Sequence, residues 1–572
     1  MKDFYKKATQ KRKFIPKDFR ISTWETLEVF IHNLLHRTVS NTQELECWLI
    51  DRAELEAVVE EDMAWRYILM NCDTENETLS QSFNDFVTNI EPHLAKASNK
   101  LDEKLLALPQ LNQINQEKYK IVIRGLKNRK ELFREKNVDI IAQLQQMEQE
   151  FGSIASKMTI THNSKELTLQ QAAVHLKDTD RDVRKKVFLA IQDRRLKDED
   201  ALNNLLTKLL KKRHECALNA DFENFRDYKF KDLGRFDYTK EDCFEFHNSI
   251  KQTVPTVLST IHLQRKNSLT LDELYPWDMD VDPNNAPPLQ PFSTAEELIQ
   301  KTLACFKEIR PNYADYIGRM VKEGYMDLDS RIGKAPGGFN YPLYESNIPF
   351  IFMNAAGTLQ DVETMVHECG HAIHSCLTAS LPLIEFKSLP SEVAELASMS
   401  MELISMEHWH HFFNNADDLR RAKRSQLEGC ISVLSWVAIV DEFQHKLYEQ
   451  PFHSVQEREE IWTSILSSYD TGIVNWKGLE KYKKSNWQRQ LHIFEVPFYY
   501  IEYGIAQLGA IAIWRNYLQN PSETLNKYES FLKLGYTIPI PDLYKAAGIE
   551  FSFSKEYISE LLSFVEKQLE SL

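Results

Sequence analysis

Three histidines and a glutamate lie close together in residues 364–376, TMVHECGHAIHSC. His367 and His371 are four residues apart, so on an α-helix their imidazoles project from one face, one turn apart. Two imidazoles in this arrangement bind one Zn²⁺ at about 2.0–2.1 Å each. Glu368 can reach a metal-bound water without becoming a ligand and can take its proton, which is the chemistry of HExxH. The segment therefore predicts half of a zinc site together with its general base.

An ordinary buried helix that is rich in histidine is the alternative interpretation, since histidines occur on many helices. The strand-like run FIFMN before the segment favours the metal site. Gly370 costs about 1 kcal/mol relative to alanine in a helix interior, which predicts a close neighbour at that position. Cys369 and Cys376 do not lie on the face of the two histidines, and we interpret them as small core residues.

The third protein ligand must come from outside the segment, because a catalytic zinc site takes three protein ligands and keeps one open position. The pattern HExxHxxGxxH would supply a third histidine at position 377. That position holds Leu377, and His374 stands at the pattern's glycine, so this class is excluded. A glutamate from a following helix is the other source, and the candidates are Glu385, Glu392, Glu395 and Glu402.

Glu395 is the preferred candidate, because it lies inside a predicted helix, SEVAELASMSMELISM, with Ser391 as N-cap. Small residues around Glu395 would let this helix approach the histidine helix, and zinc would offset the desolvation of a buried carboxylate. Glu392 falls in the first turn, where the helix dipole explains a carboxylate, and Glu385 lies in the connection. Glu402, two turns after Glu395, could hydrogen-bond a ligand histidine; a surface position explains it equally well.

Helical periodicity runs almost from end to end and glycine is scarce, at 17 residues, so we expect a mainly α fold. The proline-rich stretch 275–292 must be a loop. Residues 331–357 are the one convincingly non-helical region, where two extended runs, GGFNYPLY and IPFIFMN, predict a small sheet before the HExxH helix. A soft boundary divides a helical N-terminal lobe, 1–195, from a catalytic region, 196–572.

The composition excludes several classes of partner. The 572 residues carry a net charge of −15, which argues against nucleic acid or an anionic membrane. No stretch is apolar enough to span a membrane, and the N-terminus lacks the apolar run of a secretory signal. The eight cysteines are scattered singly without a CxxC pair, which predicts a reducing cytoplasm. Nothing indicates an obligate protein partner.

The segment TMVHECGHAIHS followed by SEVAELASMSMEL resembles the thimet-oligopeptidase-like (M3) metallopeptidases, specifically the bacterial oligoendopeptidase F branch. The resemblance extends to GKAPGGFNYPL, to PFIFMN and to HIFEVPFYYIEYGIAQ, and with the N-terminal lobe it covers most of the chain. It implies one Zn²⁺ per chain. The residues that match the zinc ligands are His367, His371 and Glu395, and Glu368 matches the general base.

The resemblance also implies that His492 and nearby tyrosines hydrogen-bond the scissile carbonyl and its tetrahedral oxyanion. Donors placed where negative charge develops stabilise the transition state. Tyr500 and Tyr503 are three residues apart and could share a helix face, but Tyr499 and Tyr503, four apart, would serve as well. Which tyrosines take part therefore stays open, and aromatic core packing explains at least one of them.

The family fold is a two-lobed, mostly helical gluzincin with a deep substrate channel and zinc on its floor, which implies oligopeptide substrates. Gly337, Gly338 and Phe339 would then form a substrate-binding edge with Tyr499, since glycines permit close approach to an extended peptide. The expected function is a cytoplasmic zinc-dependent oligoendopeptidase. A carboxypeptidase or dipeptidyl carboxypeptidase with the same ligands is the alternative, and an inactive peptide-binding protein is a more distant one.

Overall fold

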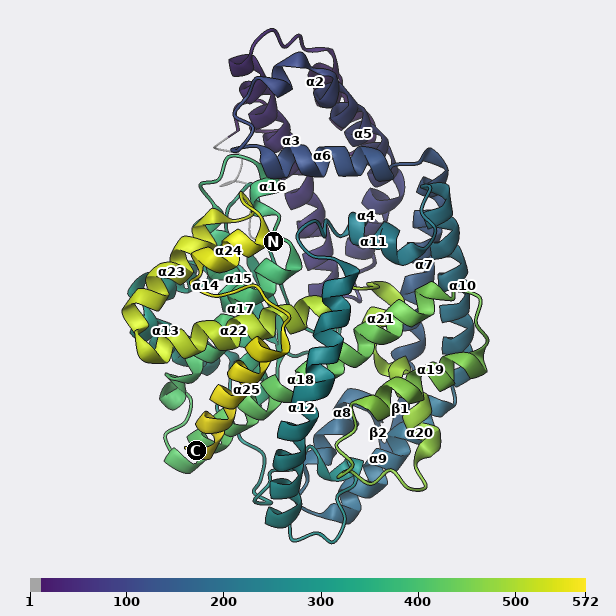
Figure 1. Ribbon diagram of the computed structural model, residues 1–572. Coiled ribbons are helices and arrows are strands. Elements are labelled where there is room, and N and C mark those ends of the chain that lie inside the picture. Colours follow the sequence, from purple (N-terminus) through teal and green to yellow (C-terminus); the bar gives the residue numbers. More distant parts are fainter. Residues whose placement is uncertain (1–11) are drawn as a thin grey trace. The chain divides into compact units, whose positions relative to one another are not determined.

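The computed structural model describes residues 12–572, which are mainly helical with two small sheets (Figure 1). The expected mainly α fold is confirmed. No helix within residues 12–572 is long and apolar enough to cross a membrane. The expectation that the N-terminus carries no secretory signal falls mainly on residues 1–11, which lie outside the described residues.

Two compact units make up the chain, and each is discontinuous in sequence. The first comprises the described residues up to Phe133 together with Gln290–Leu419 and Gly509–Phe551. The second comprises Arg134–Leu289, Arg420–Leu508 and Ser552–Leu572. A division of the sequence at residue 195 stays a prediction.

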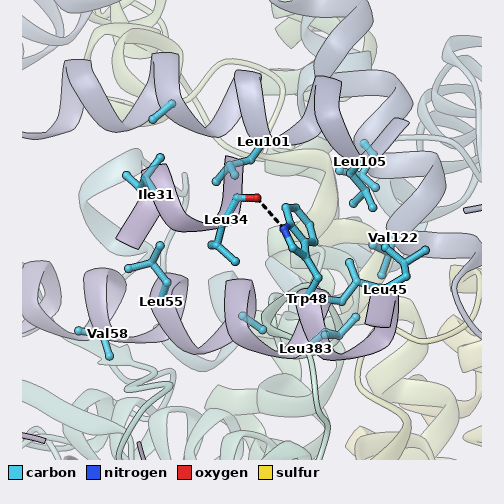
Figure 2. Close-up of a cluster of buried hydrophobic side chains, with 14 of the residues drawn as sticks. Ile31, Leu34, Leu45, Trp48, Leu55, Val58, Leu101, Leu105, Val122 and Leu383 are labelled. Atoms are coloured by element: carbon cyan, nitrogen blue, oxygen red, sulfur yellow. Dashed lines mark hydrogen bonds between the residues drawn. The ribbon is translucent and has the colours of Figure 1, made fainter. Parts of the chain in front are cut away.

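The first unit begins with helices that share one apolar core: α2 (Trp24–His36), α3 (Thr42–Cys72), α4 (Glu77–Asn89), α5 (Glu91–Ala107), the short 3₁₀ turn Pro109–Asn112 and α6 (Lys120–Leu132). Figure 2 shows Trp48 at its centre, where the indole N–H donates to the carbonyl oxygen of Leu34 at 2.9 Å. Leu383 and Phe386 belong to the same core. They follow the HExxH helix, so this core anchors the connection between the two helices of the candidate site.

The other helices of the first unit carry or support the HExxH segment. They are α13 (Ala295–Ile309), α14 (Pro311–Glu323), α15 (Leu359–Thr378), α16 (Ile384–Lys387), α17 (Ser391–Met406), the 3₁₀ turn Trp409–His411, the end of α22 (Ile501–Gln519), α23 (Pro521–Leu534) and α24 (Ile540–Ala546). The HExxH segment lies in α15. Most of the side chains on α17 are buried, because other helices of the unit cover it.

The predicted sheet before α15 is confirmed and has three strands in the order β3–β5–β4. β5 (Phe350–Ala355) runs parallel to β3 (Met326–Asp329) and antiparallel to β4 (Phe339–Tyr341). β3 was not predicted, because its sequence MDLD is half acidic. β4 is an edge strand, so one side of its backbone has no partner strand within the sheet.

The second unit is also mainly helical. Its elements are α7 (Glu135–Ala155), β1 (Thr159–His162), β2 (Lys165–Thr168), α8 (Leu169–Ala173), α9 (Arg181–Leu196), α10 (Glu199–Asn219), α11 (Phe225–Asp232), α12 (Lys240–Ser268), most of α18 (Ala416–Glu449), α19 (Val455–Ser468), α20 (Glu480–Lys484), α21 (Leu491–Glu495), the start of α22, and α25 (Lys555–Glu570), with 3₁₀ turns at Val174–Lys177, Pro276–Asp278 and Asn486–Arg489. The hairpin β1–β2 was not predicted. Its two turn residues, Asn163 and Ser164, both have positive φ, as a type I′ turn requires.

Candidate active site

The start of α15 is fixed directly after β5. Thr358 is the N-cap and forms a capping box with Asp361. The Asp361 carboxylate accepts hydrogen bonds from the backbone N–H groups of Thr358, at 2.8 Å, and Ala356, at 3.0 Å. These bonds satisfy backbone donors at the helix start and fix the residue at which α15 begins.

Helices α15 and α17 touch at Gly370, as the sequence predicted for a close neighbour. A Cβ atom at this position would lie 2.7 Å from the Cα of Ser398 and 3.2 Å from the carbonyl oxygen of Ala397. Only glycine permits this approach. The start of α17 differs from the expectation: Pro390 occupies the N-cap position, and Ser391 is already helical.

His367, His371 and Glu395 lie together across this helix contact. The Glu395 Oε2 atom is 3.4 Å from His367 Nε2 and 3.8 Å from His371 Nε2. Ligands about 2 Å from a tetrahedral zinc ion lie roughly 3.3 Å from one another, so these separations are close to those of a metal site. Ser398 donates a hydrogen bond to Glu395 Oε2 at 3.3 Å, which orients the carboxylate. The three residues form a group that could hold a metal ion.

Glu402 lies behind the group, on the other side of the His367 ring. Its Oε1 atom is 2.6 Å from His367 Nδ1. A carboxylate at this nitrogen favours a proton on Nδ1, so Nε2, which faces Glu395, is the nitrogen that would bind a metal ion. The surface position considered for Glu402 does not apply, since its side chain is mostly buried.

The electrostatics of the group favour a cation. Burial lowers the pKa of His371 to about 4, so its imidazole is neutral, as a ligand must be. Burial also opposes a charge on His367, but hydrogen bonds and attraction from Glu395 and Glu402 outweigh it and raise the pKa of His367 well above its usual value. Two carboxylates around His367 thus stabilise a positive charge at its ring, and a metal ion meets that requirement.

Glu368 is buried on α15, and its Oε2 atom accepts no hydrogen bond from residues 12–572. Burial raises the pKa of Glu368 to about 7, with a further increase from Glu395 and Glu402 and opposition from His367. The Asn340 side chain donates to the backbone carbonyl of Glu368 at 3.3 Å, so β4 contacts this turn of α15 directly. A carboxyl group with an open oxygen and a pKa near neutrality suits proton transfer.

Of the remaining conspicuous residues of the segment, Cys369 and His374 are buried and Cys376 is half-buried. Cys369 is buried, and burial raises the pKa of its thiol well above the usual value. Cys376 is half-buried, and burial raises its pKa to about 11. The His374 ring packs beside Phe531, and burial lowers its pKa to about 3. None of the three belongs to the group of potential metal ligands found among residues 12–572 around His367.

The glycine-containing loop before β4 is held in place by Lys334. Its ammonium group donates to the carbonyl oxygens of Asp327 and Asp329 at 2.9 Å, and to that of Met353. The side chain of Asn354 donates to the carbonyl oxygen of Gly337 at 2.9 Å. These bonds from β3 and β5 determine the path of the loop.

Gly337, Gly338 and Phe339 adjoin α15 along this loop. Gly337 has φ +100°, a conformation that other residues rarely adopt. A Cβ atom on Gly338 would lie 3.3 Å from the Phe352 carbonyl oxygen and 3.3 Å from the Thr364 side chain. The Phe339 ring stacks on Phe352, with centroids 4.7 Å apart. The predicted substrate-binding residues of this loop therefore lie beside the N-terminal half of α15.

His492 and the three tyrosines form a cluster within the second unit. The His492 ring centroid is 4.8 Å from that of Tyr500, 5.8 Å from Tyr503 and 6.0 Å from Tyr499. All three tyrosines therefore adjoin His492, and the choice among them stays open. Burial raises the pKa of Tyr500, so its phenol remains a neutral donor.

Gln490 holds the His492 ring and was not predicted. Its side-chain nitrogen lies 2.6 Å from His492 Nδ1, and its Oε1 accepts from the indole N–H of Trp436 at 2.8 Å. Because Trp436 can only donate, the Gln490 amide presents its N–H to Nδ1, which leaves the proton on His492 Nε2. Asn340 was missed for the same reason as Gln490: a single amide in a loop or edge strand carries no periodic signal.

Protein-family models and known peptidases resemble this chain over most of its length. Residues 174–562 match the model of peptidase family M3, and residues 14–133 match the peptidase M3 N-terminal domain. An oligoendopeptidase F homolog of Borreliella burgdorferi is 23% identical over 85% of this chain and 82% of its own length. Oligopeptidase PepF of Bacillus subtilis is 23% identical over 87% of this chain and 76% of its own length.

Solved structures have the same fold. The structure of PZ peptidase A with inhibitor 2 superposes with a TM-score of 0.90 at 25% identity and covers 98% of this chain and 99% of that one. Oligoendopeptidase F from Enterococcus faecium has a TM-score of 0.65 at 16% identity and covers 96% and 97%. The family model alone spans more than half of the sequence. This chain therefore belongs to peptidase family M3, in its oligoendopeptidase F branch.

Proposed function

We propose that this peptidase is a zinc-dependent oligoendopeptidase that hydrolyses internal bonds of short, unstructured peptides. The observation that carries the proposal is the convergence of His367, His371 and Glu395 on one point, with Glu402 behind His367. Two imidazoles and one carboxylate form a donor set that occurs in catalytic zinc sites. The orphaned carboxylate oxygen of Glu368 supports the assignment, since it needs a polar partner.

Zinc held by His367, His371 and Glu395 would supply Lewis acidity, which acidifies a water molecule and polarises a carbonyl group. Glu368 accepts the proton of the attacking water and delivers it to the leaving amine. Its raised pKa, about 7, lets it hold the proton between the two transfers. Glu402 keeps the His367 ring in the orientation and tautomer that binding requires.

His492, with Tyr500 and Tyr503, is proposed to donate hydrogen bonds to the oxyanion that forms during attack. The support is the ring cluster around His492 and the bond from Gln490, which leaves the proton on Nε2. Preorganised neutral donors of this kind stabilise developing negative charge. That this cluster acts on the same substrate as the metal-binding group is part of the proposal, and its support is the family resemblance alone.

The edge strand β4 is proposed to bind the substrate backbone. Its outer hydrogen-bonding groups have no partner strand in the sheet, so an extended peptide can add as a further strand. Gly337 and Gly338 allow a close approach, and Phe339 and Tyr499 would contact substrate side chains. A cytoplasmic location remains a prediction from the scattered cysteines.

A quenched fluorescent peptide with both termini blocked tests the proposal. An endopeptidase cuts it, and mass spectrometry then shows products from an internal bond. A carboxypeptidase or dipeptidyl carboxypeptidase leaves the blocked peptide intact but trims the same peptide with a free carboxylate. Metal analysis of the purified protein is expected to give zinc, and a chelator is expected to abolish cleavage. An inactive peptide-binding protein would cut neither peptide at any metal concentration.

A further inference from the structure

A second set of metal-binding side chains lies in the core of the second unit. Cys243 and His247 are four residues apart on α12, and Asp441 and His445 are four residues apart on α18. Each pair therefore projects from one face of its helix. All four side chains are buried, with residue exposures of 0% for Cys243 and Asp441, 1% for His445 and 3% for His247.

Cys243, His247 and His445 converge on the Asp441 carboxylate. His247 Nε2 is 2.8 Å from Asp441 Oδ2, and His445 Nε2 is 3.3 Å from the same oxygen. Cys243 Sγ, a carboxylate oxygen of Asp441 and a ring nitrogen of His445 all lie within 4.8 Å of one another. Two helices that are far apart in sequence thus bring sulfur, oxygen and nitrogen donors to one point.

Several of these polar atoms lack a hydrogen-bond partner within residues 12–572. They are Asp441 Oδ1 and both ring nitrogens of His445, whose approach to Asp441 lacks the alignment of a hydrogen bond. Three aromatic rings surround His445, those of Phe244, Phe498 and Phe230, at centroid distances of 5.0, 5.3 and 5.8 Å. Buried polar atoms in native proteins are almost always satisfied, so this group needs a partner.

A buried charge lies at the centre of this group. Burial alone would raise the pKa of Asp441, but His445 and His247 hold it well below its usual range, so a carboxylate is buried here. Burial lowers the pKa of His445, and the attraction of Asp441 opposes that change. The Cys243 thiol donates to the Thr239 carbonyl oxygen at 3.3 Å, and metal binding would replace that proton.

We propose that Cys243, Asp441 and His445 bind a structural divalent transition-metal ion, with His247 orienting the Asp441 carboxylate. Thiolate, imidazole and carboxylate together match zinc, with Co²⁺ as its spectroscopic substitute. The ion would tie α12 to α18 and would be additional to the single catalytic zinc. The inference does not depend on the proposed function, because it concerns a different group of residues.

A second group of potential metal ligands lies on the surface of the first unit, and the test must distinguish it from the buried group. Glu308 Oε2 lies 3.1 Å from His410 Nε2 and 2.7 Å from His411 Nε2, and these residues too could hold an ion. Glu308 and His410 are exposed and His411 is half-buried, and an ordinary ion pair between histidine and glutamate explains their contacts. Counting metal ions alone would not separate this group from the buried one. A cysteine ligand does, because only a thiolate gives a charge-transfer band with Co²⁺ in the near ultraviolet.

The experiment uses the full chain with His367→Ala and His371→Ala, which removes the candidate catalytic site. The protein is expressed in medium with Co²⁺ as the added metal and is dialysed against a chelator, which strips exposed sites. We expect about one cobalt ion per chain to remain and the thiolate-to-cobalt band to be present. Loss of all cobalt, or cobalt without the band, overturns the proposal and needs no further variant.

Two further variants in the same background assign the band. Cys243→Ser is expected to abolish it, and His410→Ala with His411→Ala is expected to leave it unchanged. A band that survives Cys243→Ser places the ion at another cysteine and overturns the proposal. If Cys243→Ser does not fold, His445→Gln takes its place and is expected to lose the retained cobalt; full retention by that variant is the overturning result.

Discussion

His367 Nδ1 lies 2.6 Å from Glu402 Oε1, so one histidine of the HExxH helix is fixed by a glutamate two turns after Glu395. The first prediction concerns this contact. Glu402→Ala should weaken metal binding about 10- to 100-fold, the usual cost of losing the partner of a ligand histidine. Competition with a chromogenic chelator measures the affinity.

Glu407→Gln is the control for Glu402. Its carboxylate lies directly after the same helix and accepts from the Trp514 indole at 3.0 Å, away from the histidines. Metal affinity should not change in this variant. Equal affinities for Glu402→Ala and the wild type would show that Glu402 does not support a metal ligand.

Gly370→Ala is expected to destabilise the protein and to disturb the metal group. The new Cβ atom would lie 2.7 Å from the Ser398 Cα, a backbone atom that cannot move aside without shifting α17. Overpacking of this kind costs about 1–3 kcal/mol in the free energy of unfolding. Since Ser398 and Glu395 lie on the same turn of α17, metal affinity should fall as well.

Gly429 provides the matched control for Gly370. It lies inside α18, and a Cβ atom there would meet no heavy atom within 4 Å. Gly429→Ala should therefore raise the free energy of unfolding by up to about 1 kcal/mol, since alanine favours a helix interior. Urea unfolding compares the two variants. A Gly370→Ala protein as stable as Gly429→Ala would contradict the close helix contact.

Glu368→Gln is expected to separate metal binding from turnover. Glutamine has nearly the same shape, so zinc content should stay at the wild-type level, but glutamine cannot accept the proton of the attacking water. Loss of a general base lowers kcat by about 10²–10⁴-fold. Glu363→Gln, the same chemical change earlier on α15, is the control and should retain activity. Near-normal kcat in the Glu368 variant would refute the proposed base.

The sequence predicted the site best where helical periodicity and the requirements of a metal site applied to the same residues. The four-residue spacing of His367 and His371 placed both on one face of a helix, and Gly370 indicated a close neighbour at its position. The same reasoning favoured Glu395 among four glutamates, and the structure places it 3.4 Å from His367. Extended runs with Gly and Pro predicted β4 and β5.

The features that escaped prediction depend on contacts between distant residues. β3 has an acidic sequence and is a strand because it pairs with β5. Asn340 and Gln490 act through single side-chain amides, whose partners are known only once the chain is folded. The burial of Glu402 likewise followed from packing, since its position on the helix alone was equally consistent with the surface.

The tyrosines beside His492 are separated by their kinetics. A donor that bonds only the transition state lowers kcat and leaves KM nearly unchanged, whereas a group that binds substrate raises KM. We expect Tyr500→Phe and Tyr503→Phe to lower kcat, by up to about 10²–10³-fold for a single oxyanion donor. Tyr499→Phe should chiefly raise KM. Each phenylalanine keeps the ring beside His492 and removes only the hydroxyl, so wild-type kinetics for all three variants would show that none of the hydroxyls takes part in the reaction. Steady-state kinetics on the blocked peptide would then show which of the three hydroxyls the reaction uses.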